Sequence, residues 1–173
     1  MEKITSIIIG IVSSLFASLL FLLFLKSIKP KIDISNNIAK GQDTNGKLVY
    51  RIKIINKNNR PITDVKAELK LVSPRNVDEE EIISSTNIKI ERPELFIIPK
   101  YNLTDENAGY AIRFLIYQKI EDNWKSDEQY LKFRILGHDS FSGFGEVFEK
   151  EYHNKNKVIV MGDFVKGDNF EIR

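Results

Sequence analysis

The side chains best suited to chemistry gather late in the chain, around His138-Asp139-Ser140. Such a trio can form a nucleophilic relay, in which the histidine activates the serine hydroxyl and the aspartate orients the histidine. A relay needs side chains brought together from separate elements, whereas neighbours in an extended chain point to opposite sides. We therefore interpret the tripeptide as a turn in which Asp and Ser bond the backbone. The alternative is a hydrolase that uses residues 137–145.

No residues of the chain have the spacing of a known metal- or cofactor-binding motif. His138 and His153 are the two histidines, and with Asp139 and Asp163 they match no ligand signature. The glycine-rich stretch 140–145 lacks the Lys-Ser/Thr of a phosphate-binding loop. The absence of cysteine excludes disulfides, thiolate metal sites and a cysteine nucleophile. We predict no catalytic, metal or cofactor site, and hence a protein that is not an enzyme.

Short segments of alternating hydrophobicity must position these residues. Residues 48–56 and 62–72 alternate most clearly, which predicts a sheet with one buried and one solvated face. Residues 110–120 and 130–136 are predicted to form an antiparallel hairpin, and 73–83, with its acidic run, a solvated connection. Further strands are expected at 31–35, 87–90, 95–98, 146–152 and 158–161. Eight or nine short strands with regular turns predict a mainly β domain, an antiparallel immunoglobulin-like β-sandwich.

Three aromatic residues lie in the loops of this predicted domain. Trp124 lies between the strands of the predicted hairpin, and Phe141 and Phe144 lie in the glycine-rich loop. The simpler interpretation is that Phe141 and Phe144 close one end of the sandwich. If they are exposed, they form a partner-binding tip with Trp124, because aromatic residues are over-represented at interfaces.

The N-terminal segment is a different kind of structure. Residues 4–25 are 22 residues without charge, and as a helix they would span roughly 33 Å, enough for the bilayer core. The segment is longer than a signal-peptide core and no A-x-A-like cleavage site follows it. We predict that residues 1–29 are an uncleaved, single-pass transmembrane anchor with its basic flank, and that 30–173 are the β domain.

Charge sets the predicted orientation. The chain carries a net charge of +2, which residues 1–29 hold in full because the basic and acidic residues that follow cancel. A domain without net charge argues against nucleic acid as a partner. Lys26, Lys29 and Lys31 follow the helix, so the positive-inside rule predicts a cytoplasmic domain at the cell membrane. An anchor of the opposite orientation is the alternative. The same lysines are expected to contact lipid headgroups.

One face of the anchor is lined by small residues. Ser6, Gly10, Ser14 and Ser18 are spaced four apart and therefore share one side of a helix. Small residues let helix backbones approach closely in membranes. We predict packing against another transmembrane helix, in a homo-oligomer or with a protein partner, although small residues also fall in register by chance.

The stretch YRIKIINKNNRPITDVKAELKLV resembles the strand–turn–strand of immunoglobulin-like modules on bacterial membrane and surface proteins. The anchor, its KPKI exit and the later DSFSGFGEVFEKEY segment resemble small single-pass bacterial membrane proteins. The lysine-rich, arginine-poor composition also favours a bacterial source. The resemblance implies fold and attachment, and it brings no catalytic motif.

These observations favour a membrane-tethered interaction module that binds a protein partner at the inner membrane surface. An accessory or sensor subunit of a channel, transporter or signalling complex is the alternative. A membrane-bound hydrolase is the third interpretation.

Overall fold

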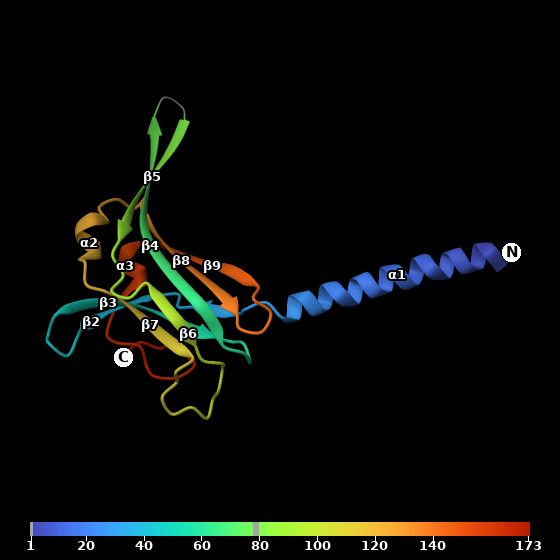
Figure 1. Ribbon diagram of the computed structural model, residues 1–173. Coiled ribbons are helices and arrows are strands. Elements are labelled where there is room, and N and C mark those ends of the chain that lie inside the picture. Colours follow the sequence, from blue (N-terminus) through green and yellow to red (C-terminus); the bar gives the residue numbers. More distant parts are fainter. Residues whose placement is uncertain (1, 78–79) are drawn as a thin grey trace.

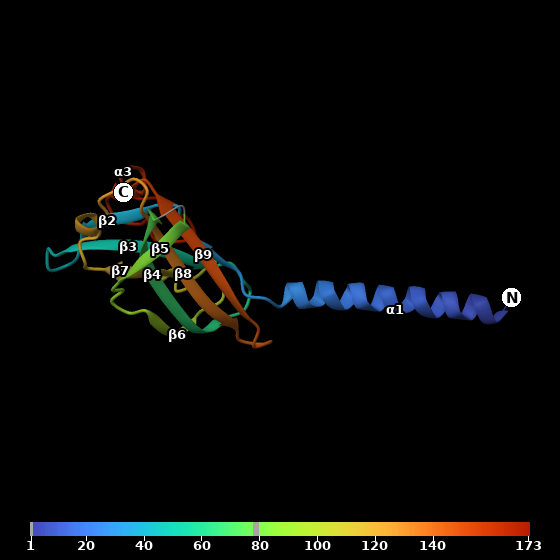
Figure 2. The same ribbon diagram turned by 90° about the horizontal axis from the view of Figure 1, so that it is seen from above.

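A computed structural model describes residues 2–77 and 80–173. A helix, α1 (Glu2–Ser27), extends away from a β domain that contains the rest of the chain (Figures 1 and 2). The strands are β1 (Ile32–Ile34), β2 (Ile38–Gln42), β3 (Leu48–Asn56), β4 (Ile62–Val77), β5 (Glu80–Ile88), β6 (Glu94–Ile98), β7 (Ala111–Ile116), β8 (Tyr130–Asp139), β9 (Gly145–His153) and β10 (Ile159–Met161). Two single-turn helices, α2 (Ile120–Asn123) and α3 (Lys155–Val158), lie between strands.

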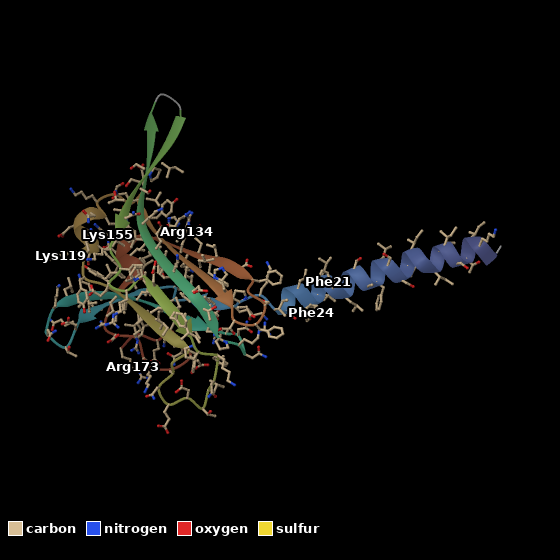
Figure 3. All side chains as sticks on the ribbon, in the orientation of Figure 1. Phe21, Phe24, Lys119, Arg134, Lys155 and Arg173 are labelled. Atoms are coloured by element: carbon tan, nitrogen blue, oxygen red, sulfur yellow. The ribbon has the colours of Figure 1, made fainter. Side chains whose placement is uncertain are left out.

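α1 is long and apolar enough to cross a membrane. Lys3–Leu25 have a mean hydropathy of 2.7, and the helix buries none of this stretch against the domain. Length and apolar composition alone also fit a signal sequence. Phe21 and Phe24 project from its C-terminal turns (Figure 3).

The strands form two sheets. In the first, β3 pairs with β1 and β2 on one side and with β7 on the other, and β10 adds to β2 in parallel. In the second, β4 pairs with β5 and β6 along one side and with β8 on the other, and β9 forms the far edge. The mainly β prediction is confirmed, although the β10–β2 pair is parallel where every pair was expected to be antiparallel.

The larger of two hydrophobic clusters in the described residues lies between the sheets. Side chains from both sheets contribute to it, such as Tyr50 and Phe114 from the first sheet and Phe133 from the second. The rings of Phe114 and Phe133 meet across the interface at 5.6 Å between centroids. Alternation along β8 is regular, so its inward residues are buried and its outward residues are half-buried.

Two predicted connections differ from the structure. The predicted hairpin of 110–120 and 130–136 is wrong, because β7 pairs with β3 whereas β8 pairs with β4 and β9. α2 instead carries the chain from one sheet to the other. Residues 73–83 are not a plain connection either, because β4 runs to Val77 and pairs with β5 as far as Glu80. The acidic residues Asp78 and Glu79 lie outside the described residues.

β3 is covered on both faces, where one solvated face was expected. The C-terminal segment after β10 lies across its outer face. Lys53, 1% exposed, donates from Nζ to the carbonyls of Val165 and Asn169, both at 2.7 Å. Burial, and then repulsion from Arg113, lower the pKa of Lys53 to about 8. The C-terminal segment thus supplies the oxygen atoms that a buried ammonium requires.

Candidate functional site

The tripeptide 138–140 does not assemble a relay. His138 and Asp139 project to opposite faces of β8, and Asp139 is 1% exposed. Its Oδ2 accepts hydrogen bonds from Arg60 Nε at 2.7 Å and from Asn58 Nδ2 at 3.1 Å. Its Oδ1 accepts from the backbone N–H groups of Phe141 and Ser142, both at 3.0 Å. The Asp139 carboxylate therefore organises a turn, as predicted from the sequence. It also binds two side chains of the β3–β4 connection, those of Asn58 and Arg60.

The hydrogen bonds to the Asp139 carboxylate favour its ionised form despite its burial. Burial acts to raise the pKa of its carboxyl group, but the hydrogen bonds from the Ser142 N–H, Arg60 and the Phe141 N–H outweigh it and hold the pKa below its ordinary value. The ion pair with Arg60, whose side chain is partly exposed, compensates the buried charge.

Asp139 and its neighbours fix the end of α1 to the domain. Arg60 Nη2 donates to the Ser27 carbonyl at 3.2 Å, and Ser142 Oγ donates to the Ile28 carbonyl at 2.9 Å. Asn58 Nδ2 donates to the Lys29 carbonyl at 3.2 Å. The last carbonyls of a helix have no partner within it. Here the domain supplies a partner for that of Ser27, the last residue of α1, and bonds the next two carbonyls of the chain. We name Asn58, Arg60, Asp139 and Ser142 the helix clamp.

The histidines lie at opposite ends of the β8–β9 hairpin. His138 is opposite Gly145, and His153 is opposite Tyr130, on which its ring stacks at 4.8 Å. His153 Nε2 lies 3.2 Å from a Glu151 carboxylate oxygen. Across residues 2–77 and 80–173, no group of three or more His, Asp or Glu side chains is placed to hold a metal ion.

The three predicted aromatic contact residues separate into two kinds. Trp124 is 1% exposed and donates from Nε1 to the Gln129 carbonyl at 2.9 Å. Its assignment as a partner contact is wrong, because its ring is part of the hydrophobic core. Phe141 and Phe144 are 77% and 43% exposed, so the interpretation that they close one end of the core is wrong, and their role in binding stays a prediction.

The residues predicted on α1 lie on its surface. Ser6, Gly10, Ser14 and Ser18 are all exposed, and Gly10 has open space where a side chain would be. Ser18 Oγ donates back to the Ser14 carbonyl at 2.9 Å. Helix packing through this face stays a prediction.

Of the lysines predicted to contact lipid, Lys29 and Lys31 are exposed. Lys29 pairs with Glu146 at 2.9 Å. The side chain of Lys26 lies outside the described residues. Contact of these lysines with headgroups stays a prediction.

A cleft that the sequence did not reveal opens between the sheets. It holds about 550 Å³ between β6, at the margin of one sheet, and β7, at the margin of the other. Its apolar floor includes Leu95, Ile112 and Phe114. The remaining lining residues are Glu91, Arg92, Ala111, Arg113, Leu115 and Tyr117. The apolar run 95–98, which lies between two prolines, could have indicated this cleft, but the sequence was interpreted as a short buried strand. Phe96 is instead 85% exposed, because β6 is a marginal strand.

β7 offers backbone groups to this cleft. It pairs with β3 along one side, where the Tyr110 carbonyl accepts from the Asn56 N–H at 2.9 Å. Backbone groups alternate in direction along a strand, so those of Arg113 and Leu115 point away from β3. The Leu115 carbonyl already accepts from the Glu91 N–H at 2.9 Å. The backbone N–H and carbonyl of Arg113 thus lie on the edge of β7 that does not pair with β3.

No family model matches this chain, and no curated protein matches it. Among solved structures it is similar to Spo0M, a sporulation control protein from Bacillus subtilis, with 13% identity and a TM-score of 0.38. The match covers 72% of this chain and 49% of that one, so the chain spans about half the length of Spo0M. A likeness of this size assigns no activity or partner.

Proposed function

We propose that this protein is a membrane-anchored binding module whose β domain captures an extended segment of a protein partner along β7. The cleft between β6 and β7 carries this proposal, since it combines an apolar floor with the edge of β7 that faces away from β3, on which the Ala111 N–H and the Leu115 carbonyl are already bonded. Strand addition of this kind takes affinity from backbone hydrogen bonds and specificity from pockets for alternate side chains.

The floor of the cleft defines the partner's chemistry. A bound strand would run beside β7 and direct one side chain toward Leu95, Ile112 and Phe114. An aliphatic or aromatic residue fits that surface, because it removes apolar area from water without burying an unpaired polar group. We therefore propose an extended, apolar-containing segment of another protein as the ligand.

The rest of the chain places this module at the membrane. In the proposal, α1 is an uncleaved, single-pass anchor, and the lysines after it keep the domain on the cytoplasmic side. The two facing sheets support an immunoglobulin-like sandwich with β10 as an added parallel strand. The role is binding and not catalysis, which the commitment of Asp139 to the helix clamp supports.

An accessory subunit of a membrane complex is the second candidate. The exposed small residues on α1 favour it, because they would let another transmembrane helix approach closely. In that case α1 and β7 would contact the same assembly.

The outward N–H of Arg113 allows a sharp test. Proline lacks this group and is tolerated in an edge strand where the N–H faces outward, so Arg113→Pro keeps the β7–β3 pairing and removes one donor for a bound strand. Arg113→Ala is the matched control, since it loses the same guanidinium and its bond to the Phe164 carbonyl but keeps the N–H.

The readout is photocrosslinking from a benzophenone amino acid at Tyr117, in the cleft, with the full chain in the membranes of its source cells. We expect one protein adduct, retained by Arg113→Ala and lost in Arg113→Pro. An adduct that survives Arg113→Pro, or no adduct at Tyr117, would overturn strand addition. A reporter fused after Arg173 tests the orientation, and an external reporter would refute the cytoplasmic placement.

A further inference from the structure

The loop between β8 and β9 is an ordered turn beside the end of α1 (Figures 1 and 2). The Asp139 N–H donates to the Phe144 carbonyl, and the Gly143 N–H donates to the Asp139 carbonyl, both at 2.9 Å. Gly143 has φ of +71°, a conformation that glycine adopts without strain. The turn is therefore fixed from within, and Phe141 is presented at its tip.

The helix clamp sets where this tip lies relative to the helix. Ser142, between the two phenylalanines, bonds the Ile28 carbonyl, one residue beyond the end of α1. Phe24 is four residues earlier, and at 1.5 Å per residue this is about 6 Å along the helix axis. The loop that carries the exposed phenylalanines thus lies beside the exposed, apolar C-terminal turns of α1 (Figure 1).

The exposed rings of Phe141 and Phe144 on a polar turn would be stabilised at a boundary between an apolar phase and water. The boundary between lipid headgroups and acyl chains is such an environment, and aromatic side chains are enriched there. Lys29 and Lys31 closely follow α1 in the chain and are exposed. Lys29 also pairs with Glu146, at the start of β9, and both ammonium groups fit anionic headgroups. Continuity with the anchor therefore favours lipid over a protein as the occupant.

We propose that Phe141 and Phe144 insert into the interfacial region of the bilayer that α1 crosses, which makes the loop a second membrane contact. This proposal rests on α1 being a membrane span. A single helix leaves α1 and its clamped domain free to tilt together in the bilayer, whereas a second contact beside the helix holds both in one orientation. The β6–β7 cleft would then lie at a set height above the membrane surface.

The absence of cysteine makes single-site labelling direct. The full chain, reconstituted in vesicles of phosphatidylethanolamine and phosphatidylglycerol, would carry one nitroxide label in place of Ser140, which leaves both phenylalanines intact. A label at Asn45, in the β2–β3 turn at the end of the domain away from α1 (Figures 1 and 2), reports the aqueous phase. A label at Leu15, in the middle of α1, reports the anchor.

Power saturation with oxygen and with a water-soluble nickel chelate gives the depth of each label. We expect the Ser140 label to be several-fold less accessible to the nickel chelate than the Asn45 label, while oxygen reaches it freely. Combining Phe141→Asp with Phe144→Asp should return it to the Asn45 value, and combining Phe141→Leu with Phe144→Leu should keep it protected.

Each other result identifies what failed. A Ser140 label as open to nickel as Asn45, with Leu15 protected, overturns the loop insertion and leaves the anchor. A Ser140 label shielded from both reagents shows that protein covers the loop, and it also overturns the proposal. A Leu15 label open to nickel refutes the anchor itself.

Discussion

Replacing Asp139 with asparagine changes one oxygen of the helix clamp to an amide group. The remaining carbonyl can still accept from the N–H groups of Phe141 and Ser142. The new NH₂ would face Arg60 Nε and Asn58 Nδ2, which are themselves donors. The variant therefore loses a buried ion pair and places donors against donors, with almost no change in volume.

The size of the loss follows from the burial of the two partners. Breaking a buried ion pair by removing one charge costs about 3–5 kcal/mol. Arg60 is partly exposed and can regain water, which places Asp139→Asn near the lower end, about 3 kcal/mol. At 2–4 °C per kcal/mol for a chain of this size, the midpoint of thermal unfolding should fall by about 10 °C.

Trp124 provides the assay, because it is the one tryptophan in the sequence and is buried in the core. Urea unfolding of the full chain in detergent, followed by tryptophan fluorescence, gives the free energy of unfolding. Asp127→Asn, at an exposed position, is the control and should be within about 0.5 kcal/mol of wild type.

The pH dependence adds a second requirement. The folded-state pKa of Asp139 is lowered, so its contribution is complete above the unfolded value and is lost as pH falls through the folded one. The difference between wild type and Asp139→Asn should be constant near neutral pH and shrink in acid below about pH 4. A loss below about 1 kcal/mol at neutral pH, or a difference unchanged in acid, would refute the clamp as described.

Three other variants test separate features. The pKa of Lys53 is about 8 in the folded protein against an ordinary 10.5, so between these pH values the unfolded chain binds more protons than the folded one. The free energy of unfolding of wild type should therefore rise relative to that of Lys53→Met, by up to about 3 kcal/mol, as pH rises through this window. Urea unfolding free energies of the two proteins that change in parallel with pH would contradict this. In Gly137→Ala the added Cβ would lie 2.5 Å from Ile62 Cγ2, and we expect a loss of about 1–3 kcal/mol in the same assay, whereas no loss would show that β4 and β8 separate easily. Gly10→Leu should abolish disulfide crosslinks between cysteines introduced on the small-residue face of α1, if that face packs against a second copy; undiminished crosslinks would exclude this packing.

The sequence predicted best what depends on local pattern. The bounds of β3 agree with the alternating stretch 48–56, and β8 begins at the predicted Tyr130. The length and apolar composition of α1 were also apparent from the sequence. These features depend on neighbours within a few residues, where hydrophobic periodicity is informative.

Features that depend on distant contacts were missed. The pattern around Lys53 predicts a solvated face, but its partners lie more than a hundred residues later in the C-terminal segment. Strands β7 and β8 have the spacing of a hairpin, yet each pairs with a strand from earlier in the chain. The helix clamp joins Arg60 to Asp139, which are 79 residues apart in the sequence, and no sequence motif predicts such a pair.

The helix clamp also leaves no hinge between α1 and the domain. The carbonyls of Ser27, Ile28 and Lys29 are held by the clamp, and the Lys31 carbonyl accepts from the Lys57 N–H at 2.9 Å. Rotation of the helix about its axis would therefore rotate both sheets by the same angle. Under the proposed function, a change in how α1 packs against a neighbouring helix would therefore also move the β6–β7 cleft relative to the segment that it is proposed to bind.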